Sequence, residues 1–499
     1  MKLPRSVYNW TSVIGLTIAI ISLFMIGFLF VISMFLDQGG SYLGLFTFII
    51  LPVFLIVGLL MIPVGMWITV KRNKKIDLLH GLSWPIVDLN DLHHRNAFAI
   101  FVVGSVFLLL VSAVGSYEAF HYTESVEFCG KLCHQVMEPE YVAYANSSHA
   151  RVSCVECHVG AGADWYVRSK LSGLRQVHAT LTNSYPTPIP TPVHDLRPAQ
   201  ETCEQCHWPE KFYPNQNRFE RHYLADEQNS EWDIGLQMKV GPQFSALGLQ
   251  AGIHWHINPD VKIEYKSVNN KRDTIPWVKY TNLKTGESQI FKSLESDFAD
   301  INMDAIQSRT MDCMDCHNRP SHDYLSPVKF VDHALTSGRL PKTLPDLKVI
   351  AMEILVTDYP TKDSAMSDIA TRITEYYQVM YPELLDTNKI LIDQTIQVLR
   401  EEFNKNIFPE MGVKWKAYPN HLGHIESNGC FRCHDQKHVS NQGEVISRNC
   451  TLCHNISAQG APDSLEVALS FESLEFTHPI NIKGKWKELL CSECHADLY

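Results

Sequence analysis

The cysteines of this chain occur in pairs, and a histidine directly follows each pair. In six pairs two residues separate the cysteines, as in the segment Cys154–His158 (CVECH). This C-x-x-C-H spacing attaches c-type haem. Each thiol forms a thioether to one haem vinyl group, and the adjacent histidine becomes the proximal iron ligand. The spacing is short because two thioethers and one iron–nitrogen bond must close on one rigid porphyrin.

The remaining pair, Cys129 and Cys133 before His134, has three intervening residues. One such motif alone could be a chance match, a redox dithiol or half of a zinc site, but here all 14 cysteines are used. We therefore predict seven covalently attached c-type haems. The cysteines and proximal histidines are Cys129, Cys133 and His134; Cys154, Cys157 and His158; Cys203, Cys206 and His207; Cys313, Cys316 and His317; Cys430, Cys433 and His434; Cys450, Cys453 and His454; and Cys491, Cys494 and His495.

Length and charge limit the classes of protein that fit. A chain of 499 residues suggests a membrane part and two or three soluble modules. The formal charge of −11 argues against a nucleic-acid partner. Cysteine-rich sequences can be disulfide scaffolds, but those are short, and the C-x-x-C-H pairing indicates haem instead. Such haem is attached on the outer face of the cytoplasmic membrane, so the motifs also predict the compartment.

Three apolar runs, residues 11–36, 42–70 and 97–117, are long enough to cross a bilayer. A cleaved signal peptide is the alternative for the first run. Because that run ends in Met34-Phe35-Leu36-Asp37 without a small-residue cleavage site, we interpret it as an uncleaved helix. No histidine lies within the three runs, so a membrane b-type haem held by two histidines is not expected.

Basic residues predict the orientation in the inner membrane. Lys2 and Arg5 precede the first run, and a basic segment, Lys71–Lys75, follows the second. The positive-inside rule therefore makes the N-terminus cytoplasmic and everything after about residue 118 periplasmic. The periplasmic part is more acidic than the whole chain. A basic periplasmic c-type cytochrome would complement it electrostatically, although the acidity could equally serve only to keep a large domain dispersed.

The predicted fold is a membrane α-helical anchor of three spans, followed by a multihaem cytochrome c domain that is mostly α-helical or irregular. Residues 1–117 form the anchor, and residues 118–335 form a tetrahaem module. Within that module, residues 231–292 lack cysteine and read as a small β insertion. Residues 336–416 have apolar side chains at helical spacing and are predicted to be a helical spacer. Residues 417–499 form a trihaem module.

Haem iron in an electron carrier needs a second axial ligand, and histidine is the most common type here. We expect the distal ligands among histidines that flank the motifs. They are His149, His222, His322, His424, His438 and His478. A reserve of other histidines on the same side is His121, His178, His194, His254, His256, His333 and His421.

The stretch FC…CHQVMEPEY…SSHARVSCVECHVG resembles the NapC/NirT family of membrane-anchored quinol dehydrogenases, over about residues 97–325. The resemblance implies that His149 and His322 are distal ligands. It also implies that Lys170, twelve residues after His158, belongs to a quinol site, and that Met137 lies near the first haem as an iron ligand.

Two departures from the family pattern are visible. The first motif has one extra residue, which displaces Met137 by one position. The acidic residue that the family has seven positions after the lysine is replaced by Val177 and then His178. His178 could accept protons in its place or act as a distal ligand. The whole layout is similar to the inner-membrane heptahaem cytochromes of metal-reducing bacteria (the ImcH type), which implies transfer of quinol electrons to periplasmic cytochromes.

The predicted function is therefore oxidation of membrane quinol, with Lys170 and His178 as the catalytic candidates for proton acceptance. The alternative for Lys170 is a structural role, in which its ammonium pairs with a haem propionate or a lipid headgroup. One rival function is a terminal reductase of a small oxyanion such as nitrite, which would need an open iron. Another is an electron-transfer subunit of a larger quinol-oxidising complex.

Overall fold

The computed structural model describes residues 8–35, 50–74, 88–160, 163–192, 198–208, 212, 214–241, 252–295, 298, 301–469 and 472–496. The chain divides into two compact units. The first contains Met1–Glu138 and Ser153–Val155, and the second contains Pro139–Val152 and Glu156–Tyr499. Most of the predicted turn after the first apolar run, with the start of the second run, lies outside the described residues.

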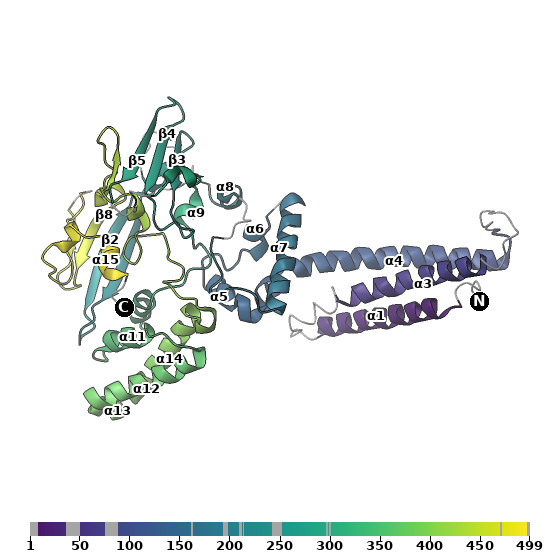
Figure 1. Ribbon diagram of the computed structural model, residues 1–499. Helices are drawn as coiled ribbons and strands as arrows, with labels where there is room; N and C mark the ends of the chain where they lie inside the picture. Colours follow the sequence, from purple (N-terminus) through teal and green to yellow (C-terminus); the bar gives the residue numbers. More distant parts are fainter. Residues whose placement is uncertain are drawn as a thin grey trace. The chain divides into compact units, whose positions relative to one another are not determined.

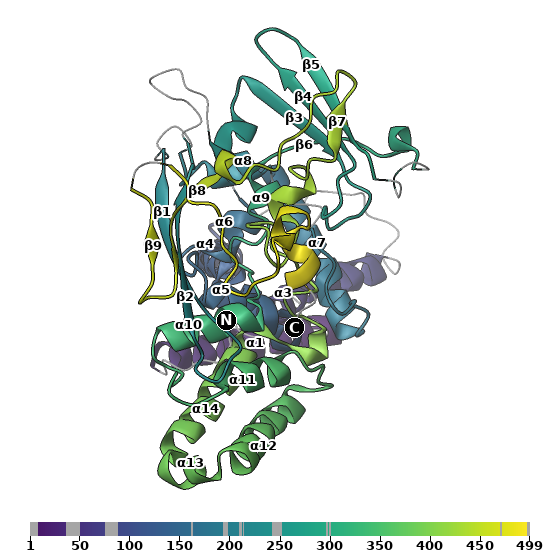
Figure 2. The same cartoon turned by 90° about the vertical axis from the view of Figure 1, so that its left-hand side faces the viewer.

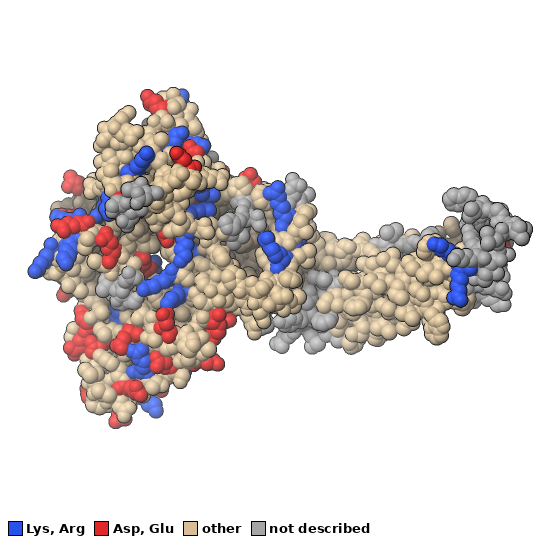
Figure 3. Space-filling model, viewed as in Figure 1, with Lys and Arg blue, Asp and Glu red and all other residues tan. Residues whose placement is uncertain are grey.

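Helices α1, Trp10–Phe35, and α3, Leu51–Lys74, lie side by side in the first unit (Figure 1). Small residues let their backbones approach closely, because a Cβ added at Gly15 would come within 2.6 Å of the Gly58 carbonyl oxygen. The Ser12 hydroxyl also donates a hydrogen bond across the pair to the Ile62 carbonyl at 3.0 Å. Most large side chains on the outer faces are apolar and exposed, and Figure 3 shows almost no charge there until the lysines and arginines at the end of α3.

By length and composition, two helices could cross a membrane: Trp10–Leu29 within α1 and Leu51–Arg72 within α3. Of the three predicted spans, the part of the chain that the structure describes thus shows two. The third predicted span falls in α4, Leu92–Glu124, which is one continuous helix. Polar residues occupy its first and last turns, and several side chains between them lie outside the description.

The first unit continues from α4 into the π-helical turn η3, Glu127–Lys131, and the start of α5, His134–Ala145. The remaining α-helices are α6 (Cys154–His158), α7 (Ala163–Leu181), α8 (Ala199–Cys203), α9 (Cys313–Cys316), α10 (Pro327–Thr336), α11 (Leu347–Leu355), α12 (Lys362–Met380), α13 (Pro382–Thr387), α14 (Lys389–Asn406) and α15 (Cys491–His495). Short 3₁₀ turns are η5 (Ile253–Ile257), η7 (Met303–Ala305), η8 (Pro409–Met411), η9 (Gly429–Arg432), η10 (Cys450–Leu452) and η11 (Lys485–Lys487).

Two antiparallel sheets make the second unit a mixed helix and sheet domain (Figure 2). The first has the order β1-β2-β8-β9 and the second β6-β3-β4-β5-β7. The strands are β1 (Gln216–Tyr223), β2 (Glu231–Met238), β3 (Val261–Lys266), β4 (Trp277–Asn282), β5 (Ser288–Ser293), β6 (Arg309–Thr310), β7 (His438–Ser440), β8 (His454–Gly460) and β9 (Glu466–Val467).

Strands therefore do form within the predicted insertion, but the sheets extend well beyond it. β8 pairs along β2, and β7 pairs with β5, so strands from the C-terminal segment complete both sheets. Backbone hydrogen bonding thus joins the segment that carries the last three motifs to the region that carries the third and fourth.

The largest apolar core lies among α10, α11, α12 and α14, which gather below the sheets in Figure 2. In α12 the fully buried residues Ile369, Ile373 and Tyr377 recur every fourth position, as the spacing in the sequence predicts. Burying each such aliphatic side chain contributes about 1.5–3 kcal/mol. The helical segment therefore has a packed apolar core of its own, which Tyr223 of β1 joins.

Candidate functional site

Several motifs fold as a single helical turn, as in α6, α9 and α15. The His317 amide donates to the Cys313 carbonyl at 2.8 Å, and the His207 amide donates to the Cys203 carbonyl at 2.8 Å. In such a turn, positions i, i+3 and i+4 lie on one side. The two thiols and the imidazole of one motif can therefore meet one flat group.

Six of the motif histidines each face one further histidine across a gap of 5.8–6.4 Å between ring centroids. The pairs are His158 with His322 (6.2 Å), His207 with His149 (6.1 Å), His317 with His254 (6.4 Å), His434 with His256 (5.8 Å), His454 with His424 (6.2 Å) and His495 with His478 (6.1 Å). The side chain of the seventh motif histidine, His134, lies outside the described residues.

The spacing of these pairs fits one metal ion between two imidazoles. With two metal–nitrogen bonds of about 2 Å each, trans imidazoles have ring centroids about 6 Å apart. Two nitrogens alone make a poor protein metal site, and among the described residues no group of three or more His, Cys, Asp or Glu could hold a bare ion. The arrangement therefore fits iron whose other four positions are filled by a porphyrin bound to the adjacent cysteines.

The second histidine of most pairs is oriented by its other ring nitrogen. The Nδ1 atom of His149 lies 3.0 Å from the Pro320 carbonyl oxygen, and that of His322 lies 3.0 Å from the Glu140 carbonyl. The Nδ1 atom of His478 similarly lies 2.8 Å from the carbonyl of Ile480. An Nδ1–H that donates to a carbonyl leaves Nε2 unprotonated, which is how proteins orient a metal-binding imidazole. Burial lowers the pKa of His322 to about 4, so its ring is neutral near pH 7.

Four of the six histidines predicted from the sequence, His149, His322, His424 and His478, face a motif histidine. His222 does not: its Nδ1 lies 3.4 Å from a carboxylate oxygen of Asp332.

His438 is also absent from these pairs. Its Nδ1 contacts Asp435 at 2.9 Å and its Nε2 contacts the Ile275 carbonyl at 2.7 Å. Neither nitrogen is left for a metal in this conformation. His222 on β1 and His438 on β7 thus contact polar partners of their own rather than a motif histidine, and their role as distal ligands stays a prediction.

The other two partners, His254 and His256, come from the 3₁₀ turn η5. In the sequence analysis these two histidines were only additional candidates for distal ligands, because they lie far from any motif along the chain. The available signal was two histidines two residues apart in a region without cysteine.

The first motif belongs to the first unit. Cys129 lies in η3, and Met137 lies one turn after His134 in α5. The Cys129 thiol hydrogen-bonds that of Cys154 and so lowers the pKa of Cys154 to about 7. The attachment points of the first two motifs are therefore adjacent. An analogous contact joins Cys203 with Cys313, of the third and fourth motifs, and lowers the pKa of Cys203.

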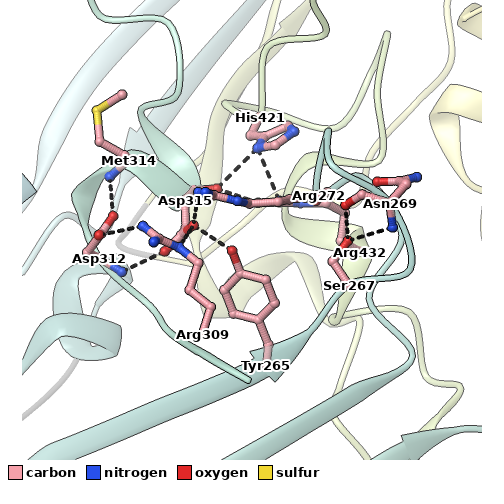
Figure 4. Close-up of polar contacts among 10 residues, drawn as sticks. All are labelled: Tyr265, Ser267, Asn269, Arg272, Arg309, Asp312, Met314, Asp315, His421 and Arg432. Carbon is pink, nitrogen blue, oxygen red and sulfur yellow. Dashed lines mark hydrogen bonds and ion pairs between the residues drawn. The ribbon is translucent and has the colours of Figure 1, made fainter. Parts of the chain in front are cut away.

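Charged and polar side chains hold the fourth motif in place (Figure 4). The buried carboxylate of Asp315, between its two cysteines, accepts hydrogen bonds from Tyr265 at 2.5 Å, Arg309 at 2.9 Å and Arg272 at 3.0 Å. Burial is the largest cause that raises the pKa of Tyr265, and the Asp315 charge adds to it. Asp315 also closes a capping box with Asp312, which fixes the turn that presents the thiols.

The predicted quinol-site residues lie on α7. Lys170 is half-buried, with its ammonium 5.1 Å from the centre of the Tyr166 ring, and His178 is exposed two turns later. The described geometry does not pair His178 with a motif histidine. α7 also exposes a stripe of large apolar side chains, including Leu174 at 67% and Leu181 at 81%. Lysine and arginine side chains gather over the same helix in Figure 3.

Comparison with known proteins gives three findings. The model of the NapC/NirT cytochrome c family, N-terminal region, matches residues 92–200. The chain is 40% identical over 495 residues to cytochrome c-type protein ImcH of Geobacter sulfurreducens, covering 99% of this chain and 96% of that protein. It is 33% identical over 102 residues to cytochrome c-type protein NrfH of Wolinella succinogenes, covering 20% of this chain and 57% of that protein. No solved structure matches.

Proposed function

The chain belongs to the ImcH-type multihaem cytochromes c and contains the NapC/NirT N-terminal region, and from this we propose that it is an inner-membrane quinol dehydrogenase. It would transfer electrons from the membrane quinone pool to periplasmic carriers through seven covalently attached haems. The cysteine pairs support this haem number, the kinship with ImcH supports c-type haem, and the NapC/NirT region supports the quinol link.

The observation that carries the proposal is the set of six facing histidine pairs. An iron with histidine on both sides has no open position, so it can carry an electron but cannot bind a substrate. A site built for reduction of an oxyanion needs an open face. Because six of the seven motif histidines face a second histidine, the geometry favours electron transfer over terminal reduction.

We propose four distal ligands from the sequence prediction. His322 ligates the iron of the second motif, His149 that of the third, His424 that of the sixth and His478 that of the seventh. For the first motif Met137 stays a proposal that rests on resemblance. Bound haem would supply a one-electron iron couple at each motif, and at the six motifs with facing histidines the protein would supply two imidazole nitrogens and hold their orientation.

The membrane part is proposed to hold three spans, with α4 as the third in addition to α1 and α3. Lys71, Arg72 and Lys74 at the end of α3 would lie on the cytoplasmic side, which places the haem segments in the periplasm. A basic periplasmic c-type cytochrome is the proposed electron acceptor.

The quinol site is proposed at α7. A helix that exposes leucines along one stripe and carries Arg168, Lys170 and Arg175 has the character of a helix at a lipid surface. Quinol arrives from the lipid, and its oxidation releases two protons with two electrons. Lys170 would hydrogen-bond a quinol oxygen, and His178, on the apolar stripe, would accept a proton.

A Lys170→Gln variant tests this site, with Arg175→Gln as a matched control on the same helix. We expect Lys170→Gln to slow haem reduction by a quinol analogue at least tenfold, with all seven haems attached and reduction by dithionite unchanged. The Arg175→Gln variant should retain the wild-type rate. Wild-type quinol turnover in Lys170→Gln would remove that residue from the mechanism.

The test of the function uses membranes in which this chain is the only added cytochrome. A quinol analogue should reduce its haems, and a quinone-site inhibitor should block the reduction. Reduction by dithionite alone would favour the alternative of a subunit in a larger complex. Rapid reoxidation by nitrite would favour the oxyanion reductase.

A further inference from the structure

We propose that His254 and His256, two residues apart in η5, ligate two different haem irons, those of the fourth and fifth motifs. This inference rests on the proposed function in one respect, that haem occupies these motifs. It makes η5 a two-haem junction between the first four motifs and the last three.

The ring geometry supports one iron for each histidine. His254 faces His317 at 6.4 Å with their planes 1° apart, and His256 faces His434 at 5.8 Å with their planes 77° apart. Successive residues of a 3₁₀ turn point about 120° apart, so His254 and His256 diverge by roughly 120° around the turn. They cannot both approach one porphyrin from the same side, and each reaches a different motif.

Both rings are fixed for metal binding by their second nitrogen. The Nδ1 atom of His254 lies 3.1 Å from the Val240 carbonyl oxygen, and that of His256 lies 2.8 Å from the Ile253 carbonyl. In each ring Nε2 is the nitrogen that remains for iron.

The turn that carries them is held on both sides. The Ile253 amide donates to the Lys239 carbonyl at 2.8 Å, and Trp255, between the two histidines, stacks on Tyr280 of β4 at 5.6 Å. Gly252 enters the turn with a φ of +101° and packs so closely on the backbone of residues 239–241 that a Cβ would come within 2.7 Å. Such a rigid turn can set the separation of two irons.

An independent contact ties the same two motifs together (Figure 4). Arg432, between the cysteines of the fifth motif, donates to the carbonyl of Asp315, between the cysteines of the fourth, at 2.7 Å. It also donates to the Arg272 carbonyl at 2.6 Å, and its side chain is buried. This buried guanidinium links the turns of the fourth and fifth motifs and so holds them at a fixed position relative to each other, as a junction between two haems requires.

The test uses the full chain, purified in detergent with its haems, and electron paramagnetic resonance of the oxidised protein. His254→Ala should remove one low-spin haem of seven and add one high-spin haem, while mass analysis still finds seven haems because every cysteine is retained. His256→Ala should do the same, and the double variant should convert two. Added imidazole should restore the low-spin state.

The two single variants should also lose different signals. Parallel imidazole planes split the iron d orbitals and give a rhombic spectrum, whereas perpendicular planes leave two orbitals nearly degenerate and give one with a very large g value. The His254→Ala difference spectrum should therefore lose a rhombic component, and the His256→Ala difference spectrum a large-g component. His254→Met, which supplies a different ligand, should stay low-spin with altered g values even if the alanine variant folds poorly.

His222→Ala is the matched control, because His222 flanks a motif along the chain but faces Asp332. It should leave all low-spin signals in place. Seven haems with unchanged low-spin signals in both η5 variants would overturn this inference alone, as would loss of a low-spin haem in His222→Ala. Fewer than seven haems in the wild-type protein would instead overturn the proposed haem complement.

Discussion

Breaking the buried ion pair between Lys348 and Asp332 is expected to destabilise the helical core strongly. The Lys348 ammonium donates to Asp332 and to the Tyr223 carbonyl, both at 2.5 Å, and the two side chains are only 3% and 4% exposed. The three residues come from α11, α10 and β1. The pair therefore holds the helical core against the first strand of a sheet.

The magnitude follows from what Lys348→Met leaves behind. Methionine fills much of the lysine volume, but the Asp332 carboxylate stays buried without its cation, which costs about 3–5 kcal/mol. With a urea dependence of about 2 kcal/mol per molar, the unfolding midpoint should fall by about 2 M. Removing both charges in Lys348→Met with Asp332→Leu should return the midpoint close to that of the wild type, because no lone charge is then buried.

Pulse proteolysis of the detergent-solubilised protein in urea measures these midpoints. The control is Lys437→Met, which removes the partner of Glu295 in an ion pair whose side chains are 48% and 40% exposed. An exposed pair contributes less than about 1 kcal/mol, so its midpoint should move by less than about 0.5 M. A Lys348→Met shift no larger than that of Lys437→Met, or a double variant no better than the single, would refute the reasoning.

Two further predictions concern the polar network and pH. Asp315→Asn should lower stability by about 2–4 kcal/mol because two arginines lose their shared carboxylate, whereas Tyr265→Phe, which deletes one hydrogen bond, should cost about 1 kcal/mol; equal urea midpoints for the two variants would contradict this. Burial, with a hydrogen bond to Asp368, raises the pKa of Tyr359 from 10.0 to about 12. Because the phenol then ionises first in the unfolded state, stability should fall as pH rises from about 10 to 12, and Tyr359→Phe should make that fall shallower; an unchanged slope in alkaline unfolding curves would exclude Tyr359 as a cause.

The attachment motifs were readable from the sequence because their chemistry is local. Two cysteines and a histidine within one turn reach the same porphyrin whatever the rest of the chain does. The helix of residues 362–380 was predictable for the same reason, since Ile369, Ile373 and Tyr377 form a buried stripe at helical spacing. Two of the three apolar spans also follow from composition alone.

The histidines that face a motif histidine were only partly predictable because proximity in sequence is a weak guide to proximity in space. His149 lies just before the second motif yet faces His207 of the third, and His322 lies just after the fourth yet faces His158 of the second. His438 lies close after His434 in the sequence, but its ring nitrogens contact a carboxylate and a carbonyl instead of facing a motif histidine. Each outcome depends on backbone contacts between distant segments.

The sequence by itself determined the number of paired thiols, the histidine that accompanies each pair and the apolar helices, because these depend on spacing within a turn or on hydrophobicity within a run. Only the tertiary structure decided which second histidine faces each of the six motif histidines whose side chains are described. That choice is made where β7 and β8 join strands more than a hundred residues earlier, and where η5 stacks on Tyr280 of β4 and hydrogen-bonds to the Lys239 carbonyl. Such pairings are set by hydrogen bonds and packing between remote segments, which no local pattern encodes.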